Sequence, residues 1–466
     1  MLGIGTLLPW SSSVVTLPWI AAAARHPPVP PPEVSDALLG VITLAFSLTN
    51  TATVFTIAKA GLAARLPPAA QVPAPLIACV FASIAAALAA HADAGGSPLG
   101  GRTVVSFALP AAVVQGALTA LLNCGGAAMA APMPPRVMRA YFAGQALAGL
   151  GASTGAFVAA AVVAPGQSKR PAENDAEALA ALARHASWAF AATSALLTLC
   201  LGAYFTLRRM DAAARHPPPL LQRRGGDTFA DAAAAPLLDD ADRAEQANAP
   251  VEPAEAETAP LVPHVADADA DDCDVEDDDV AELRLYKLCV FVIYIVSLCV
   301  YPDITAWLRP AAARGDGGAT AAAAPFGVRM RGDLLVPFSF VVFNAGDLAG
   351  RLVAAALPQL KAKQLLPLLV ARGVIPLLLL TCNIAPPEGR WAAPPLLARS
   401  DTAPLLLLAT LAMSNGAATT LAMTGGPACA APARRGAAAT TLTACLVAGI
   451  SAGSALSVLL SLLMQR

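Results

Sequence analysis

The chain has 466 residues, of which 56% are hydrophobic and 13% are charged, and its mean hydropathy is +0.60. Soluble domains are about 45–50% apolar and about 25% charged, so the composition excludes an ordinary soluble protein and is typical of a polytopic membrane protein. The formal net charge of -2 gives no indication of nucleic-acid binding.

Apolar runs long enough to cross a bilayer recur along the whole chain. A membrane-spanning helix needs roughly 20 largely apolar residues. On that criterion we expect eleven spans, at 1–24, 37–61, 74–92, 103–128, 137–164, 184–207, 284–308, 333–357, 363–384, 403–429 and 436–463. The sequence therefore predicts an all-α polytopic membrane protein with eleven transmembrane helices.

A long polar segment separates the sixth span from the seventh. Residues 208–283 open with basic residues and close with the acidic run DADADDCDVEDDD. Their Pro, Ala and Asp content cannot bury a core, so we expect a disordered acidic cytoplasmic loop, although such a run could also bind a cation or a partner. The expected organisation is a six-helix bundle at 1–207, this loop, and a five-helix bundle at 284–466, a 6+5 arrangement like that of the major facilitators. A slight excess of Lys and Arg on alternate connections places the N-terminus in the cytoplasm.

The segment FNAGDLAGR, at 343–351, puts two charges inside the eighth span. Asp347 and Arg351 are spaced i, i+4 and so share one helix face, where they can neutralise each other, and Asn344 extends the same polar face. Lipid offers this face no partner, so it must meet a cavity or another helix. A structural ion pair between helices is one interpretation; a substrate or gating role is the default for charges inside a membrane.

A second buried cation, Arg372, lies in the ninth span with no acidic residue in its own segment. Its partner must come from another helix, and we expect Asp347 to be that partner. Two arginines sharing one aspartate would leave guanidinium donors free for the hydroxyl or carbonyl groups of a polar solute.

Neutral amides and one tryptophan are the corresponding candidates in the first half. Gln115, Asn123 and Gln145 both donate and accept hydrogen bonds, which suits the edge of a heterocycle, but such amides also serve as bonds between helices. Trp10 follows Pro9 in the first span and could stack on a flat ring or belong to an interfacial aromatic belt.

The sequence gives no indication of enzymatic chemistry. No Ser/His/Asp set, phosphate-binding loop or metal cluster stands out, so we expect neither a catalytic residue nor a cofactor. The nine cysteines are scattered singly and are interpreted as small apolar residues rather than disulfide or metal ligands. They are Cys79, Cys124, Cys200, Cys273, Cys289, Cys299, Cys382, Cys429 and Cys445.

Several short motifs in this order resemble the equilibrative nucleoside transporter family, over essentially every helix. They are GTLLPW (5–10), QG (115–116), GQALAG (144–149), YPDIT (301–305), PFSFVVFNAGDLAGR (337–351), LLPLLVARGVIPLLLLTCN (365–383) and SNG (414–416). The most specific motifs of this resemblance are the eighth-span segment with Asp347 and Arg351 and the ninth-span segment with Arg372. The resemblance implies an eleven-helix fold similar to the major facilitators, with a cytoplasmic N-terminus and a central nucleoside site.

The family's site residues fall on particular positions of this chain. The resemblance implies that Trp10 and Gln115 contact the nucleobase and that Asp347 and Arg372 hold the ribose. The supporting polar network would comprise Asn344, Arg351, Gln145 and Asn415. Two departures stand out: Ser11 occupies a position where the family commonly has Asn, and the residues that precede GTLLPW in the family are missing, so we expect the first span to be incomplete.

We therefore expect a monomeric nucleoside transporter that moves purine or pyrimidine nucleosides, or nucleobases, down their gradient by alternating access. A proton-coupled symporter on the same fold is the first alternative, and a sensor or scaffold that no longer transports is another. The expected location is the plasma membrane, as an integral multi-pass protein, with an internal membrane left open. The expected partners are the nucleoside and the lipid bilayer, without nucleic acid.

Overall fold

A computed structural model describes residues 1–24, 32–66, 68–95, 101–163, 176–215, 277–310, 334–385, 397 and 400–465. The chain divides into two compact units, one formed by Met1–Tyr204 with Glu276–Arg466 and one by Phe205–Val275. The first unit contains the helix bundle. Most of the predicted acidic loop, 216–276, lies outside the described residues, and so does Cys273.

The N-terminal half of the bundle contains six long helices within the described ranges. They are α1 (Leu2–Ala24), α2 (Pro32–Lys59), α5 (Pro73–Ala94), α6 (Gly101–Ala130), α7 (Pro135–Val163) and α8 (Ala176–Arg215). Two one-turn helices, α3 (Leu62–Arg65) and α4 (Pro68–Gln71), connect α2 to α5. The six helices coincide with the six predicted spans, although α8 continues eight residues beyond the predicted boundary at 207.

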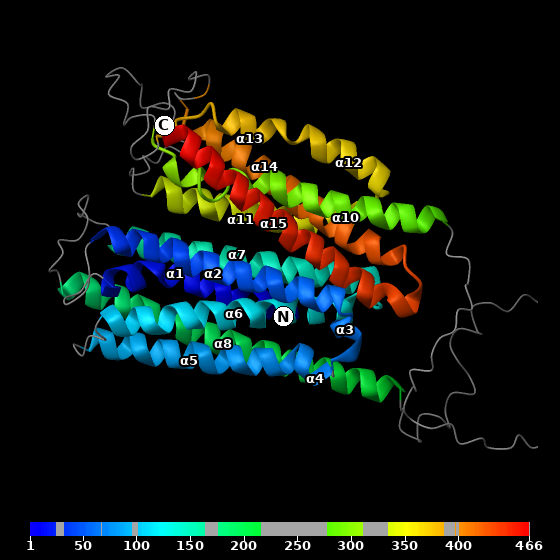
Figure 1. The fold of residues 1–466 in the computed structure, drawn as a ribbon, viewed down its shortest axis with the longest axis horizontal. Helices are drawn as coiled ribbons and strands as arrows, with labels where there is room; N and C mark the ends of the chain where they lie inside the picture. Colours follow the sequence, from blue (N-terminus) through cyan, green and yellow to red (C-terminus); the bar gives the residue numbers. More distant parts are fainter. Residues whose placement is uncertain are drawn as a thin grey trace, which may run out of the picture. The chain divides into compact units, whose positions relative to one another are not determined.

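The C-terminal half supplies the other five spans within the described ranges. Its elements are α10 (Asp277–Leu298), η2 (Thr305–Trp307), α11 (Leu335–Ala356), α12 (Ala362–Ala371), α13 (Val374–Leu379), α14 (Thr402–Ala428), η6 (Pro432–Arg434) and α15 (Arg435–Gln465). In Figure 1 these helices lie together above those of the N-terminal half. The eleven-helix all-α prediction is confirmed, with α12 and α13 together forming the ninth span.

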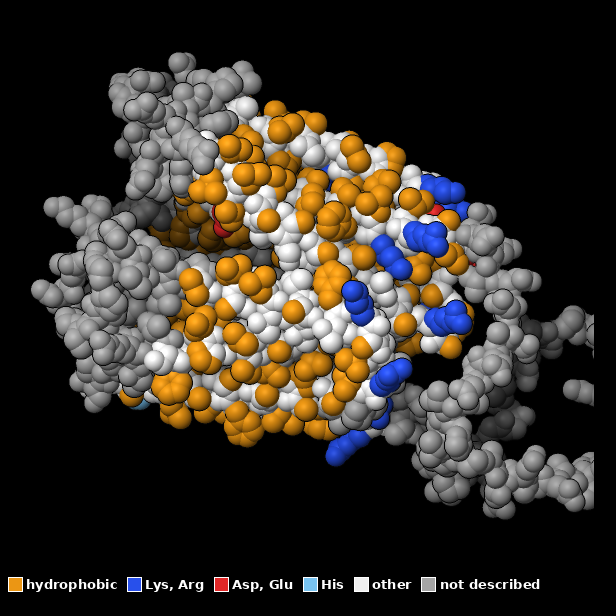
Figure 2. Space-filling model, viewed as in Figure 1, with side chains coloured by type: hydrophobic (Ala, Val, Ile, Leu, Met, Phe, Trp, Pro, Cys, Tyr) orange, Lys and Arg blue, Asp and Glu red, His pale blue; other side chains and the backbone are white. Residues whose placement is uncertain are grey.

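The flanks of the bundle are apolar and one end is basic. Among the described residues, nine segments meet a criterion of length and hydropathy for crossing a membrane, and α1 and α10 are the two helices of the eleven that do not. Large hydrophobic side chains are exposed on the flanks, for example Phe107 at 70% and Trp188 at 77%, whereas Lys and Arg gather at one end (Figure 2). Soluble monomers rarely expose apolar surface of this extent, and a bilayer explains it. The chain is an integral multi-pass membrane protein.

Glycines allow α11 and α14 to pack closely, which positions the polar residues described below. A Cβ atom at Gly350 would collide with the backbone of Met413, and one at Gly416 would collide with the backbone of Asp347. Small residues at these points let the two backbones approach, as is usual between membrane helices. Asp347 and Asn415, one residue before Gly416, are thereby brought side by side.

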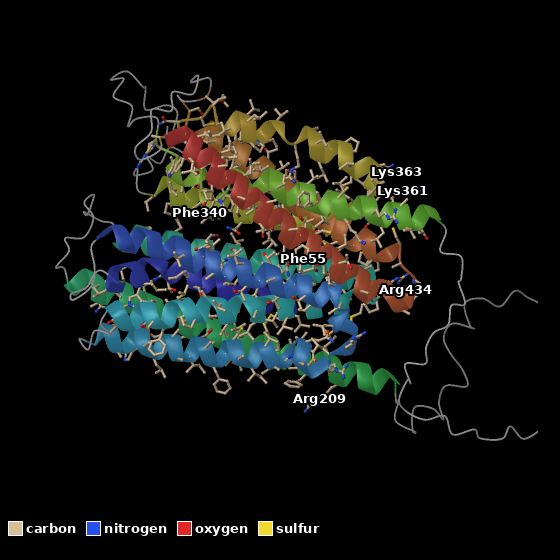
Figure 3. The ribbon with its side chains drawn as sticks, viewed as in Figure 1. Phe55, Arg209, Phe340, Lys361, Lys363 and Arg434 are labelled. Carbon is tan, nitrogen blue, oxygen red and sulfur yellow. The ribbon has the colours of Figure 1, made fainter. Side chains whose placement is uncertain are left out.

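The two halves meet along α7 and α11 and along α15 with α2 and α6. Arg139 donates a hydrogen bond across this seam to the carbonyl of Ala355 (2.8 Å). The hydroxyls of Thr51 and Ser451 form another, at 3.0 Å. The bond from Arg139 to Ala355 lies near the basic end of the bundle, where Lys361, Lys363 and Arg434 are labelled in Figure 3.

The break between α12 and α13 falls at Arg372, and Pro376 explains it. A proline has no N–H, so the carbonyl four residues earlier loses its helical hydrogen bond. The Arg372 carbonyl instead accepts from the Ile375 N–H at 3.0 Å, which tightens the chain locally. Arg372 therefore lies at an interruption in the ninth span rather than in the middle of a continuous helix.

Candidate substrate site

A cavity of about 290 Å³ lies between the two halves. This volume is close to the lower end of the range usual for small-ligand pockets. Both halves contribute to its lining: Leu7, Trp10, Phe46, Ser47, Asn50, Thr51, Thr119, Asn123, Ala127, Tyr141, Phe142 and Gln145 from the first, and Tyr294, Leu298, Tyr301, Phe343, Asp347, Arg351, Asn415, Thr443, Leu446, Val447, Ile450 and Ser451 from the second.

The predicted ion pair forms in the wall of this cavity. Arg351 Nε donates to Asp347 Oδ2 at 2.8 Å, and both residues are buried. Arg351 also crosses to the other half of the bundle, where its Nη1 donates to the Phe142 carbonyl at 3.0 Å and its guanidinium lies 5.8 Å from the Phe142 ring centroid. The pair thus joins α11 to α7 and also presents polar atoms to the cavity.

Arg372 reaches Asp347 through two intermediate side chains. Arg372 Nη2 donates to Ser297 Oγ (2.7 Å), and Ser297 Oγ donates to Asn415 Oδ1 (2.8 Å). Asn415 Nδ2 then donates to Asp347 Oδ1 (2.7 Å). The expected direct pairing is therefore replaced, within the described residues, by a hydrogen-bonded relay that passes through α10 and α14.

The remaining contacts of Arg372 explain why it lies behind the cavity wall. Its Nη2 also donates to the Leu411 carbonyl at 3.1 Å, and its Nη1 lies 3.5 Å from the Ile293 carbonyl. The residue is 6% exposed and is not part of the cavity lining. Backbone carbonyls thus occupy donors that we expected to face a solute.

Gln145 connects three helices in the first half. Its Nε2 lies within hydrogen-bond distance of Asn123 Oδ1 (3.0 Å), Thr6 Oγ1 (3.1 Å) and the Tyr141 hydroxyl (3.3 Å). An amide has two N–H donors, so these three acceptors share them. Gln145 and Asn123 line the cavity, as residues of a substrate site must.

The other predicted base-binding residues occupy different positions. Trp10 lines the cavity and stacks on Phe46 with ring centroids 3.7 Å apart and an interplanar angle of 12°. Gln115 is absent from the lining; its Oε1 accepts from the Ser13 hydroxyl at 3.0 Å. One face of Trp10 is therefore covered by an aromatic ring, and Gln115 contacts α1 rather than the cavity.

Asn344 supports the second half from outside the cavity lining. Its Nδ2 donates to the Phe340 carbonyl (2.9 Å) and lies 3.4 Å from the Tyr301 hydroxyl. Tyr301 stacks on Phe343 with centroids 3.7 Å apart and an interplanar angle of 8°. Asn344 thus holds an aromatic pair that lines the cavity.

Two polar atoms in the wall have no partner among the described residues. Asn50 Oδ1 and Thr119 Oγ1 are both buried, and both residues line the cavity. Buried polar atoms are nearly always hydrogen-bonded, so each exception requires an explanation. Their position makes a bound solute or water the natural partner.

Several of these residues give little signal in the sequence. Ser297, Asn50 and Thr119 are single polar residues in apolar runs, which is a weak signal because such residues usually bond their own helix backbone. Phe46 and Tyr301 give no signal because aromatic residues occur throughout apolar segments. Each stacks on an aromatic residue far away in the sequence, Phe46 on Trp10 and Tyr301 on Phe343, and a local pattern does not reveal such a contact.

An eleven-helix membrane bundle, with a cavity between its halves that is largely apolar and carries a few charged and amide groups, is the architecture of a solute transporter. The family model for "Nucleoside transporter" matches residues 109–462 of this chain, and the chain belongs to that family. It is a nucleoside transmembrane transporter.

Among solved structures, the chain is similar to the E. coli fucose:proton symporter FucP, in a variant form. The two share 13% identity with a TM-score of 0.47, and the match covers 99% of this chain and 90% of that one. No curated protein sequence matches the chain.

Proposed function

We propose that this transporter moves nucleosides down their concentration gradient by alternating access, with the central cavity as the substrate site. The observation that carries the proposal is the concentration of buried polar groups at the seam of an otherwise apolar bundle. Asp347, Arg351 and Asn415 supply them from one side, and Gln145 and Asn123 from the other. Polar groups at membrane depth are costly and mark solute pathways.

A nucleoside offers a flat heterocycle and a sugar with hydroxyl donors. The Asp347 carboxylate accepts hydrogen bonds, so it suits the ribose hydroxyls, and Asn415 orients it. The aromatic and amide groups of the first half, Trp10 and Gln145, suit the faces and edges of a base. Gln115 and Arg372 act through neighbours, the first through Ser13 and the second through the relay.

The ion pair supports downhill movement over proton coupling. Arg351 lies 2.8 Å from Asp347 and gives this carboxylate its counter-charge from within the protein. Both oxygens of Asp347 are bound, Oδ2 by Arg351 and Oδ1 by Asn415, so carrying a proton across would require this network to break. The proton-coupled symporter remains the alternative that the experiment below separates.

The cross-seam contacts support an alternating mechanism. The bond from Arg139 to Ala355 closes the seam near the basic end, at the start of α7 and the end of α11. Figure 2 shows the surface hollowed between the halves toward the other end. Opening the basic end requires that bond, and the one from Arg351 to Phe142, to break.

The test is uptake of a labelled nucleoside and nucleobase panel into transporter-deficient cells, with and without an inward proton gradient. The proposal expects equilibration of nucleosides in both directions, unaffected by a protonophore. Accumulation against a gradient that stops with the protonophore supports the symporter instead. Correctly inserted protein that moves no solute supports the sensor or scaffold.

A further inference from the structure

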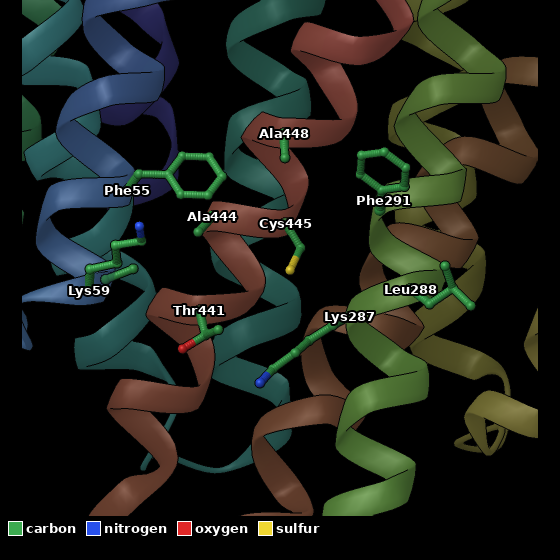
Figure 4. A pocket seen from close by; sticks show the side chains of 10 residues that line it. Phe55, Lys59, Lys287, Leu288, Phe291, Thr441, Ala444, Cys445 and Ala448 are labelled. Carbon is green, nitrogen blue, oxygen red and sulfur yellow. The ribbon is translucent and has the colours of Figure 1, made fainter.

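A groove of about 450 Å³ opens on the outer surface of the bundle, apart from the central cavity. Its floor is α15, where small residues leave a depression at Ala444, Cys445 and Ala448. The walls come from both halves of the bundle: Phe55 of α2 on one side and Phe291 of α10 on the other (Figure 4).

Two lysines stand at one end of this otherwise apolar groove. Lys59 is the last residue of α2, and Lys287 lies in α10. Figure 4 shows them on either side of α15, both toward the same end, with the two phenylalanines toward the other. Among the residues that the structure describes, neither ammonium group has a hydrogen bond or an ion pair, so both charges are available to a ligand.

We propose that this groove binds one anionic glycerophospholipid. Lys59 and Lys287 hold the phosphate, and an acyl chain lies over Ala448 between Phe55 and Phe291. The charge pattern carries the assignment. Lysines at the edge of the hydrocarbon extend their ammonium groups to the headgroup level, and each attracts anionic lipid. Lys59 ends α2 next to α3, toward the end of the bundle where Lys and Arg gather, which suits a headgroup in the leaflet on that side.

The position of the groove gives the lipid a role in holding the halves together. Lys59 belongs to the first half and Lys287 to the second, so a phosphate held by both lysines joins the two halves. The opposite face of α15 lines the central cavity through Thr443, Val447 and Ser451. A bound lipid therefore braces the helix that separates the groove from the cavity, and favours the conformation in which α2 and α15 are in contact.

The proposal is tested by measuring, with native mass spectrometry, how tightly the purified and delipidated full chain binds lipid. The probes are phosphatidylglycerol and phosphatidylcholine with identical acyl chains. The unaltered protein should bind phosphatidylglycerol more tightly. Each lysine near the membrane surface contributes about a fivefold preference, so Lys59→Gln with Lys287→Gln should weaken phosphatidylglycerol binding about 25-fold.

The matched control removes two charges from the same end of the bundle but outside the groove. Lys363→Gln with Arg434→Gln lowers the net charge equally, and binding should be unchanged. A third variant, Ala448→Leu, fills the groove and should weaken binding with both lysines intact. Glycerol 3-phosphate, which has the phosphate but no acyl chain, should not compete.

Three results would overturn the proposal. Equal loss of phosphatidylglycerol binding in the groove and control variants would mean that general charge attracts the lipid. Equal binding of both lipids by the unaltered protein would remove the role of the lysines. Displacement of the lipid by glycerol 3-phosphate would mean that the site takes a free phosphate.

Discussion

Arg372 and Asp347 are linked through Ser297 and Asn415, over three hydrogen bonds of 2.7, 2.8 and 2.7 Å. The relay runs from α12's end through α10 and α14 to α11. Asp347 is thus bound on both oxygens, by Arg351 at Oδ2 and by Asn415 at Oδ1. A solute that bonds this carboxylate meets a group whose orientation is fixed by four helices.

Replacing Asp347 with Asn should reduce nucleoside uptake to background. The change leaves the buried Arg351 cation without its counter-charge, at a cost of about 3–5 kcal/mol. Adding Arg351→Gln removes that charge and should recover thermal stability but not uptake. Uptake, surface protein and melting temperature are measured together, with Asp279→Asn, an exposed carboxylate at the start of α10, as the control. Near-normal uptake by Asp347→Asn would remove this residue from the mechanism.

Replacing Ser297 with Ala should break the relay while keeping both charged residues. A hydrogen bond to a charged group is worth about 1.5–3 kcal/mol, so uptake should fall about ten- to hundredfold. Arg372→Ala should do the same or more. The control is Thr410→Ala, an exposed hydroxyl bonded only to its own helix among the described residues. Unchanged uptake by Ser297→Ala would show that Arg372 acts independently of Asp347.

Replacing Gly416 with Ala should separate α11 from α14. The new methyl group would collide with the Asp347 carbonyl oxygen and would lie 3.0 Å from the backbone nitrogen of Arg351. Overpacking of this kind costs about 1–3 kcal/mol. Lower thermal stability and weaker uptake are expected, whereas Gly151→Ala, with open space around its Cβ, should be neutral or slightly stabilising. Equal melting temperatures for the two variants would contradict the close packing.

Replacing Thr119 with Val should separate binding from stability. The Thr119 hydroxyl is buried without a partner among the described residues, so removing it costs no hydrogen bond in the empty protein. We expect unchanged or higher thermal stability and a KM for nucleoside raised several-fold. A Thr119→Val protein that is less stable but has an unaltered KM would contradict this interpretation and would indicate a structural role for the hydroxyl.

Uptake should vary little between about pH 5.5 and pH 7.5, because downhill transport is driven by the nucleoside gradient and not by a proton gradient. Efflux from preloaded cells should proceed as readily as influx, since both follow the nucleoside gradient. The measurement is initial-rate uptake and efflux in buffered media with a protonophore present or absent. Strong acceleration at low pH, abolished by the protonophore, would favour proton coupling.

The sequence by itself determined the spans and the main polar residues. Hydropathy and length predicted eleven helices because every spanning segment must be apolar and must satisfy its backbone internally. The spacing of Asp347 and Arg351 predicted their ion pair, since i, i+4 geometry is local to one helix. Isolated polar and aromatic residues in apolar runs predicted Trp10 and Gln145, the family motifs added Asn415, and all three line the cavity.

Only the tertiary structure decided which polar groups meet. The relay from Arg372 to Asp347 depends on how α10, α11 and α14 pack, and no spacing within one helix encodes it. The same holds for Gln115, which bonds Ser13 instead of lining the cavity. Contacts between helices arise from close packing of whole surfaces, set here by glycines such as Gly350 and Gly416. A local pattern identifies the polar residue, and the packing selects its partner.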